Sequence, residues 1–182
     1  MTVLGAVLTG GASRRMGRDK ATLPVEGVAM ADRVATALRA GCADVVAIGP
    51  AERAGAQQPV ADLFPGEGPV GGLITALREA ERRGCEHVFV TACDLAFLDA
   101  ETVRRLLAAS GMAVDSVVAA QTDRVEPLCA VWPVSAAARI EQIFTDGERA
   151  MHRVLDALTV TIVSVPAAAL RNVNTPDDLG EG

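Results

Sequence analysis

Val3-Leu4-Gly5-Ala6-Val7-Leu8-Thr9-Gly10-Gly11 opens the chain with an apolar run that ends in two glycines. A continuous apolar run of this length is typical of a strand that is buried on both faces of a parallel sheet. We therefore predict a strand over Val3–Thr9. The two glycines let the backbone turn sharply and approach a ligand closely, so the loop beyond this strand is a candidate binding site.

The rest of the chain alternates short β-branched runs with longer amphipathic ones. The pattern predicts further strands at residues 44–49, 87–92, 114–120, 128–132 and 158–165, and helices at residues 29–40, 69–83, 100–110, 134–144 and 148–158. Asp99 is the predicted N-cap of the third helix, which Gly111 ends, and Thr175 begins a short final helix. This alternation predicts a single α/β domain over residues 1–182, with a mostly parallel sheet and helices on both faces. Ligands bind beyond the carboxyl ends of the strands in such a sheet.

Composition excludes several classes of function. The 182 residues carry a formal net charge of −6, and 50% of them are hydrophobic. The acidic balance argues against non-specific binding of nucleic acid or of anionic membranes, both of which need clustered positive charge. No apolar run reaches the ~20 residues of a membrane span. No basic leader precedes the first strand, and the four cysteines form no CxxC pair, so we expect a cytoplasmic protein without a zinc site or disulfides.

Positive charge gathers directly after the first strand. Arg14, Arg15, Arg18 and Lys20 place four positive charges in seven residues of an acidic protein, and Lys20 is the only lysine of the chain. Together with the backbone amides of the two glycines, these charges suit a polyphosphate. The residue order is neither a Walker A loop nor a GxGxxG fingerprint. The alternative is an ordinary strand–loop turn with a solvated basic face.

Residues 8–20 closely resemble the L-x-G-G-x-S-x-R-M-G-x-D-K signature of sugar-phosphate-type nucleotidyltransferases. Within that superfamily the chain most resembles the molybdenum cofactor guanylyltransferase family, and the match continues at four later places. The resemblance implies a three-layer, Rossmann-like (GT-A-like) fold, with a nucleotide-binding half at about residues 1–98 and an acceptor-binding half at about residues 99–182. It also implies Mg²⁺-dependent transfer of GMP from GTP to molybdopterin, with release of pyrophosphate.

The same resemblance implies roles for particular residues of the first half. The residues expected to bind the nucleotide are Leu8, Thr9, Gly10, Gly11, Arg15 and Lys20. Arg15 and Lys20 are also expected to act as catalytic residues that offset charge on the triphosphate. Asp62 is expected to help hold the nucleoside. Gly71 and Gly72, at the start of the following helix, are expected to pack against the nucleotide. The alternatives are a turn cap for Asp62 and a tight helix entry that needs glycine for packing alone.

Cys93-Asp94-Leu95-Ala96-Phe97-Leu98 follows the third strand. A carboxylate at the end of a buried strand is costly without a partner, and Mg²⁺ binds through one or two carboxylates plus phosphate oxygens. The segment resembles the family's C-D-x-P-F-[LI] pattern, although Ala96 replaces the usual proline. The resemblance implies that Asp94 is the metal ligand, a nucleotide contact and a catalytic residue. The alternative is an aspartate that caps the following turn.

Two segments of the second half are expected on the acceptor side. Pro127 stands at the start of a strand that borders the acceptor pocket in the family, although a core strand explains the same residues. Asn172 and Asn174 are two residues apart, so their amides point to the same face of an extended segment and suit a pterin edge or a metal-bound water. The partners implied are GTP, molybdopterin and, transiently, other proteins of molybdenum cofactor biosynthesis or apo-molybdoenzymes.

Two rival functions remain open. One is a CTP-dependent molybdopterin cytidylyltransferase or another nucleotidyltransferase that acts on a small phosphorylated molecule. Such relatives resemble L-A-A-G in the first loop, whereas this chain has Leu8-Thr9-Gly10-Gly11, and the loss of a methyl group near the base would admit a larger purine. The other is a regulatory protein that binds nucleotide without turnover, against which the presence of Asp94 and Lys20 argues.

Overall fold

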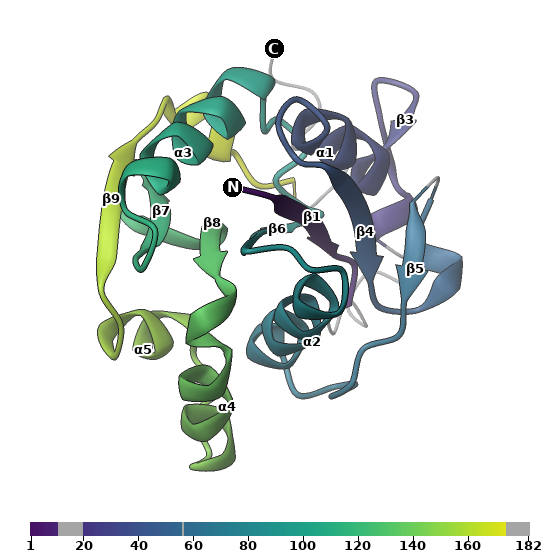
Figure 1. The fold of residues 1–182 in the computed structure, drawn as a ribbon. Coiled ribbons are helices and arrows are strands. Elements are labelled where there is room, and N and C mark those ends of the chain that lie inside the picture. Colours follow the sequence, from purple (N-terminus) through teal and green to yellow (C-terminus); the bar gives the residue numbers. More distant parts are fainter. Residues whose placement is uncertain (11–19, 56, 174–182) are drawn as a thin grey trace.

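The computed structural model describes residues 1–10, 20–55 and 57–173 of the chain. A central sheet has the strand order β5-β4-β1-β6-β8-β7-β9 (Figure 1). Its strands are β1 (Val3–Leu8), β4 (Asp44–Ile48), β5 (Gln58–Val60), β6 (His87–Ala92), β7 (Val117–Gln121), β8 (Val125–Pro133) and β9 (Val160–Ser164). Strand β8 is antiparallel to both of its neighbours, whereas the other pairs are parallel. The predicted mostly parallel sheet is confirmed.

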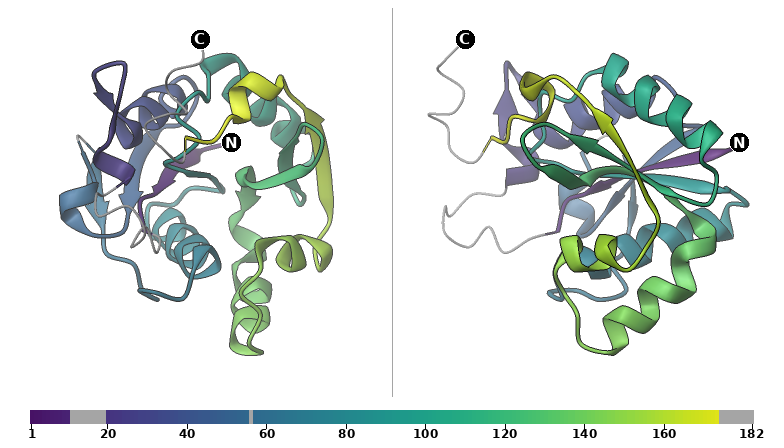
Figure 2. Two further views of the ribbon diagram at one scale, coloured as in Figure 1. Left: turned by 180° about the vertical axis from the view of Figure 1, so that it is seen from behind. Right: turned by 90° about the vertical axis from the view of Figure 1, so that its left-hand side faces the viewer.

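Helices cover both faces of this sheet (Figure 2). They are α1 (Met30–Leu38), α2 (Pro69–Arg82), α3 (Ala100–Met112), α4 (Ala137–Thr145) and α5 (Met151–Asp156). One core layer joins the sheet to α2, α4 and α5, and the other joins it to α1 and α3. The three-layer α/β architecture is therefore confirmed. Among the described residues, no helix is both long enough and apolar enough to cross a membrane.

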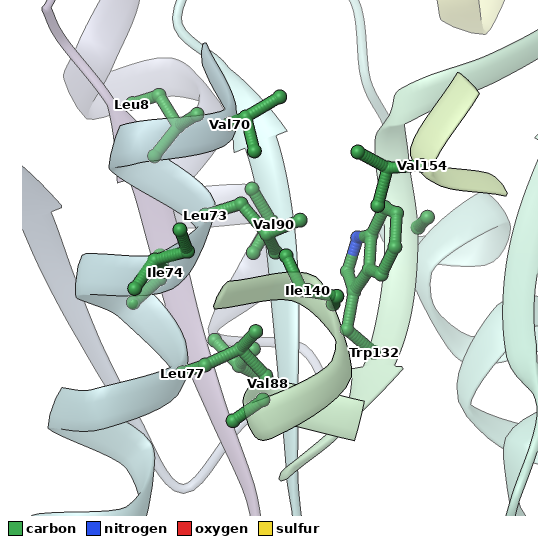
Figure 3. Packing of buried hydrophobic residues seen from close by; sticks show 14 of the residues in the cluster. Leu8, Val70, Leu73, Ile74, Leu77, Val88, Val90, Trp132, Ile140 and Val154 are labelled. Carbon is green, nitrogen blue, oxygen red and sulfur yellow. The ribbon is translucent and has the colours of Figure 1, made fainter. Parts of the chain in front are cut away.

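Trp132 lies at the centre of the core layer beneath α2, α4 and α5 (Figure 3). Its indole is fully buried, and it pairs in register with Val88 of the neighbouring strand. Around it pack Val90 of β6, Ile140 of α4 and Val154 of α5. Because side chains of paired residues point to the same face of a sheet, β6 and β8 present one continuous apolar surface to these helices. Helices from both halves of the chain consequently share one core.

Local polar contacts set several helix boundaries. Asp99 caps α3 as predicted, since its Oδ1 accepts a hydrogen bond from the Thr102 N–H at 2.7 Å. The predicted stop at Gly111 is wrong, because α3 continues to Met112. The helix predicted to start at residue 148 starts only at Met151. There the Glu148 carboxylate accepts the N–H groups of Arg149 and Ala150, both at 2.8 Å, and holds them before the helix.

Other predicted elements differ in extent. The helix predicted at residues 134–144 divides into a 3₁₀ turn, η4 (Val134–Ala136), and α4. The strand predicted at residues 114–120 begins only at Val117, because a turn that joins the Ser116 N–H to the Ala113 carbonyl at 3.0 Å precedes it. Shorter elements complete the fold: a hairpin of β2 (Pro24–Val25) and β3 (Val28–Ala29), and the 3₁₀ turns η2 (Lys20–Thr22), η3 (Ala51–Arg53) and η5 (Ala167–Leu170). The final helix predicted from Thr175 lies outside the described residues.

Candidate active site

Four parallel strands end side by side at one edge of the sheet. Leu8, at the end of β1, pairs with Ile48 of β4 on one side and with Ala92 of β6 on the other, and Ile48 pairs in turn with Val60 of β5. The residues that directly follow these strands therefore lie along the same edge, where ligands of open α/β sheets bind. They include Thr9, Gly10, Gly49, Asp62 and Asp94.

The turn after β1 is held against the end of β4. The N–H and the hydroxyl of Thr9 both donate to the Ile48 carbonyl, at 3.0 and 3.1 Å. A Cβ atom on Gly49 would lie 2.7 Å from the Thr9 hydroxyl and 3.1 Å from the Gly10 nitrogen, and Gly49 has a φ of +140°. Only glycine permits this approach. The turn thus leaves Gly10 exposed at the edge, while the Thr9 side chain serves the framework.

The other residues predicted in the first loop have different placements. The Leu8 side chain lies in the core, and the Leu8 carbonyl accepts a hydrogen bond from the Cys93 N–H at 3.2 Å. Lys20 begins the turn η2. Gly11 and Arg15 lie outside the described residues. The proposed contacts of all these residues with a nucleotide stay predictions.

Asp62 is half-buried after β5, with its two oxygens in different surroundings. Oδ1 accepts the Phe64 N–H and the Thr75 hydroxyl, both at 3.0 Å. Oδ2 lies 4.0 Å from the position that a Cβ atom on Gly10 would take. Asp62 is therefore a turn cap through one oxygen, while its other oxygen lies beside Gly10. The structure brings these two predicted nucleotide-binding residues, Asp62 and Gly10, together.

Gly71 and Gly72 lie where the first turns of α2 meet the rest of the protein. A Cβ atom on Gly71 would lie 2.8 Å from Cβ of Phe64, and one on Gly72 would lie 3.2 Å from a methyl group of Leu8. Protein atoms thus fill the space that these glycines were expected to clear for a nucleotide. The structure supports packing as the reason for both glycines, and their contact with a nucleotide stays a prediction.

Asp94 is half-buried in the turn after β6. Its carbonyl accepts a hydrogen bond from the Val173 N–H at 2.9 Å. Val173 is 2% exposed and packs with Ala96 from the same turn. Asn172, half-buried, directly precedes this anchor, so the predicted acceptor segment runs alongside the predicted metal ligand. Asn174 lies outside the described residues.

Glu126, at the start of β8, is a second carboxylate at this edge that sequence reasoning missed. Burial raises the pKa of Glu126, and the negative charge of Asp94 acts in the same direction, opposed by a hydrogen bond from the Leu128 N–H. The signal is the register of β6 with β8, which pairs Thr91 with Cys129 and, if continued, sets Asp94 opposite Glu126. Sequence alone does not reveal that register.

The donor set at this edge suits a hard cation. Among the described residues, no group of three or more His, Cys, Asp or Glu side chains is arranged to hold a metal ion. Mg²⁺ needs only one or two carboxylates when substrate phosphates complete its coordination. Asp94 and Glu126 supply that number of carboxylates, so the residues present fit a Mg²⁺ ion that binds together with a nucleotide.

A cation also reaches the turn after β1 from a neighbouring loop. Arg53, in η3 after β4, places Nη1 3.4 Å from the Thr9 carbonyl oxygen. This puts a guanidinium beside the exposed Gly10. The sequence holds no signal for Arg53, because the contact depends on how β4 and β1 are paired.

Pro127 lines a cavity of about 430 Å³ on the second half of the chain. Strands β8 and β9 and helix α5 form its walls, with Val125, His152, Leu155 and Ile162 among the lining residues. The contact of Pro127 with an acceptor stays a prediction.

The loop between Asp62 and α2 is fastened to the second half of the chain. The Phe64 and Phe144 rings lie 4.8 Å apart, centroid to centroid. The Arg149 guanidinium stacks 3.7 Å above the Phe144 ring, and its Nε donates to Glu67 at 2.7 Å. These contacts hold one wall of the site in place.

Comparison with known proteins identifies the family to which the chain is similar. Residues 5–162 match the model of the MobA-like NTP transferase domain. A probable molybdenum cofactor guanylyltransferase of Opitutus terrae is 37% identical, over 96% of this chain and 91% of the relative. A molybdenum cofactor guanylyltransferase of Rhodobacter capsulatus is 34% identical, over 98% of this chain and 94% of the relative.

A solved structure shows the same arrangement of elements. The molybdopterin-guanine dinucleotide biosynthesis protein A of Archaeoglobus fulgidus superposes with a TM-score of 0.78 at 26% identity, covering 97% of this chain and 95% of that one. Fold and sequence similarity over nearly the full length lead to one assignment. The chain belongs to the MobA-like NTP transferase family.

Proposed function

We propose that this protein transfers GMP from GTP to molybdopterin, forming molybdopterin guanine dinucleotide and releasing pyrophosphate. The observation that carries the proposal is similarity to molybdenum cofactor guanylyltransferases over nearly the whole chain. The shared edge that holds Gly10, Asp62 and Asp94 supports it, because these are the residues to which the resemblance assigns the nucleotide and the metal.

The reaction is an in-line attack by the molybdopterin phosphate on the α-phosphorus of GTP. No covalent nucleophile is needed, so the protein contributes position and charge neutralisation. The amides of Gly10 and Gly11 hold the triphosphate, and Arg15 and Lys20 offset its charge. Asp62 holds the nucleoside.

Two further parts of the site complete the proposal. Asp94, with Glu126 beside it, would hold Mg²⁺, which when bound neutralises charge on the phosphate oxygens. Asn172, Asn174 and Pro127 would bind the acceptor. All three come from the second half of the chain, so nucleotide and acceptor would meet at the edge between the halves.

Nucleotide preference is the sharpest test of this function. Melting temperatures are measured with GTP, CTP, ATP and UTP, each with and without Mg²⁺, and pyrophosphate release is measured with molybdopterin. A ligand present at 100 times its Kd adds about 2.7 kcal/mol to the free energy of unfolding. We expect the largest stabilisation with GTP and Mg²⁺, and pyrophosphate release with GTP. Preference for CTP would indicate a cytidylyltransferase, and binding without pyrophosphate release would indicate a regulatory protein.

A further inference from the structure

Thr75 is a polar residue inside an otherwise apolar stretch of α2. It is 2% exposed, and its neighbours Leu73, Ile74, Ala76 and Leu77 are all buried in the core. A buried hydroxyl costs free energy unless it forms hydrogen bonds. Valine would fill the same volume without that cost, so the hydroxyl of Thr75 calls for an explanation beyond packing.

Three groups surround the Thr75 hydroxyl. The Leu63 N–H donates to Oγ1 at 3.0 Å, while the Asp62 Oδ1 and the Gly71 carbonyl each lie 3.0 Å from it as acceptors. The hydroxyl has one proton, so it serves one acceptor at a time. A carboxylate is the stronger acceptor, and the Gly71 carbonyl lies one helical turn before Thr75, where the helix supplies a backbone donor. The proton therefore goes to Asp62.

The contacts of Thr75 define how the Asp62 carboxylate is turned. Oδ1 is held from two directions, by the Thr75 hydroxyl and by the Phe64 N–H. With Oδ1 held, Oδ2 lies 4.0 Å from the position that a Cβ atom on Gly10 would take. Thr75 is part of a 14-residue helix packed in the core, so the position of its hydroxyl is fixed. The Asp62 carboxylate is on a loop, and its hydrogen bond to this hydroxyl orients it.

We infer that Thr75 is a positioning residue for nucleotide binding, acting through Asp62, whose Oδ2 it presents to a hydrogen-bond donor of the nucleoside. The inference rests on the proposed function, in which Asp62 contacts the nucleoside. It adds a residue that orients the carboxylate through a hydrogen bond to Oδ1 and does not contact the ligand itself.

Thr75→Val tests the inference because it removes the proton and keeps the shape. We expect the Kd and the KM for GTP to rise about tenfold, the equivalent of about 1.4 kcal/mol, while kcat stays close to the parent value. Thr75→Ser restores the hydroxyl and should recover most of the affinity. Thr75→Cys, a weaker donor of similar size, should give a smaller rise in Kd and serves if the valine variant is not recovered in folded form.

Thr102→Val is the matched control. Thr102 is 1% exposed on α3, so the same isosteric change is made at another buried helical site, on a helix that packs in the other core layer from α2. We expect this variant to bind GTP like the parent, whatever it does to the melting temperature. A rise in Kd that follows the loss of stability in both variants would overturn the positioning role.

A double-mutant cycle separates action through Asp62 from a general effect on the helix. In the Asp62→Ala background, Thr75→Val should cause no further loss of GTP affinity. An equal loss in both backgrounds, or an unchanged Kd for Thr75→Val alone, would overturn the inference. If the parent bound a nucleotide other than GTP, the proposed guanylyl transfer would fail, and the same variants measured with that nucleotide would decide the role of Thr75.

Discussion

Asp94 shows what a single charge does at this site. It lies half-buried in the turn after β6, and its negative charge helps to raise the pKa of Glu126, after the larger effect of burial. Asp94→Asn keeps the shape and removes the charge that Mg²⁺ requires. We expect kcat to fall by more than about 100-fold, since residues that only support a metal ligand already contribute about 10–100-fold.

The fold should survive this substitution, because asparagine has nearly the same size and shape and can still accept hydrogen bonds. Melting temperature and circular dichroism therefore serve as the control. Mg²⁺-dependent transfer of nucleotide by Asp94→Asn at near the parent rate would show that the metal assignment is wrong.

Lys20 is a second residue whose role a single substitution can test. It is the only lysine in a chain with 16 arginines, so its retention is informative only if arginine cannot replace it. Lysine is a compact point charge, whereas arginine is a wide planar fork. We expect Lys20→Ala to lower kcat/KM for GTP and Lys20→Arg not to restore it. Full activity of Lys20→Arg would mean that the lysine arose by compositional chance.

A site residue could be predicted from the sequence where its position depends on its neighbours in the chain and not on tertiary contacts. Asp94 comes two residues after a predicted strand, so its place at the sheet edge follows from the chain order. Asp62 comes after β5, a strand that the sequence did not predict, and only the family resemblance pointed to it. Glu126, Arg53 and Thr75 reach the same edge through strand register or through a helix packed from below. Such contacts depend on the tertiary structure, and one sequence carries no pattern for them.

At the scale of elements, the C-terminal end of α2 is tied to two strands by a chain of ion pairs. Glu79 Oε1 lies 2.6 Å from Arg83 Nε, and Arg83 in turn contacts Asp44 of β4 and Gln58 of β5. Hydrogen bonds from Arg82 and Arg83 hold the pKa of Glu79 at about 2. Because this pKa is lower in the folded than in the unfolded chain, the ionised carboxylate stabilises the fold at neutral pH.

Glu79→Gln should therefore destabilise the protein in a manner that depends on pH. Above the unfolded pKa of about 4.3 we expect a constant loss of about 1 kcal/mol in the free energy of unfolding. Below it the difference from the parent should shrink and vanish near pH 2. Urea denaturation across this range measures it, with Glu101→Gln on the exposed face of α3 as the control. A difference that does not change between pH 6 and pH 3 would contradict the role of Glu79.

The helices and strands that could be predicted are those whose apolar residues recur with a clear period. Helices α1 and α2 and strands β1, β4 and β6 lie within about two residues of their predicted ranges. The hairpin of β2 and β3 has two residues in each strand, and β5 has three with Pro59 among them, too few for any period to be visible. Gly111 failed as a helix stop because it adopts no positive φ, which is what favours glycine at a helix end.

At the scale of the whole molecule, the site is built from both ends of the chain. Strand β9 leads through η5 to Val173, which is bonded to the carbonyl of Asp94 from the first half. The Arg171 guanidinium stacks 4.0 Å from the centroid of the Phe97 ring and adds a second contact between the same two segments. The segment predicted to bind the acceptor is therefore held directly against the loop of the predicted metal ligand, so the binding of each ligand has to be measured separately in any variant of either segment.

Asn172→Ala and Asn174→Ala should consequently impair molybdopterin more than GTP. Gly10 and Asp62 are assigned to the nucleotide, and Asp94 to the junction, whereas a pterin still needs amide partners that both donate and accept. Leaving one buried pterin group unpaired should cost about 1–3 kcal/mol of acceptor binding. Measuring the Kd for GTP and the Kd for molybdopterin separately for each variant tests this. If the asparagines only brace the backbone around Val173, both ligands should lose affinity equally and the melting temperature should fall with them.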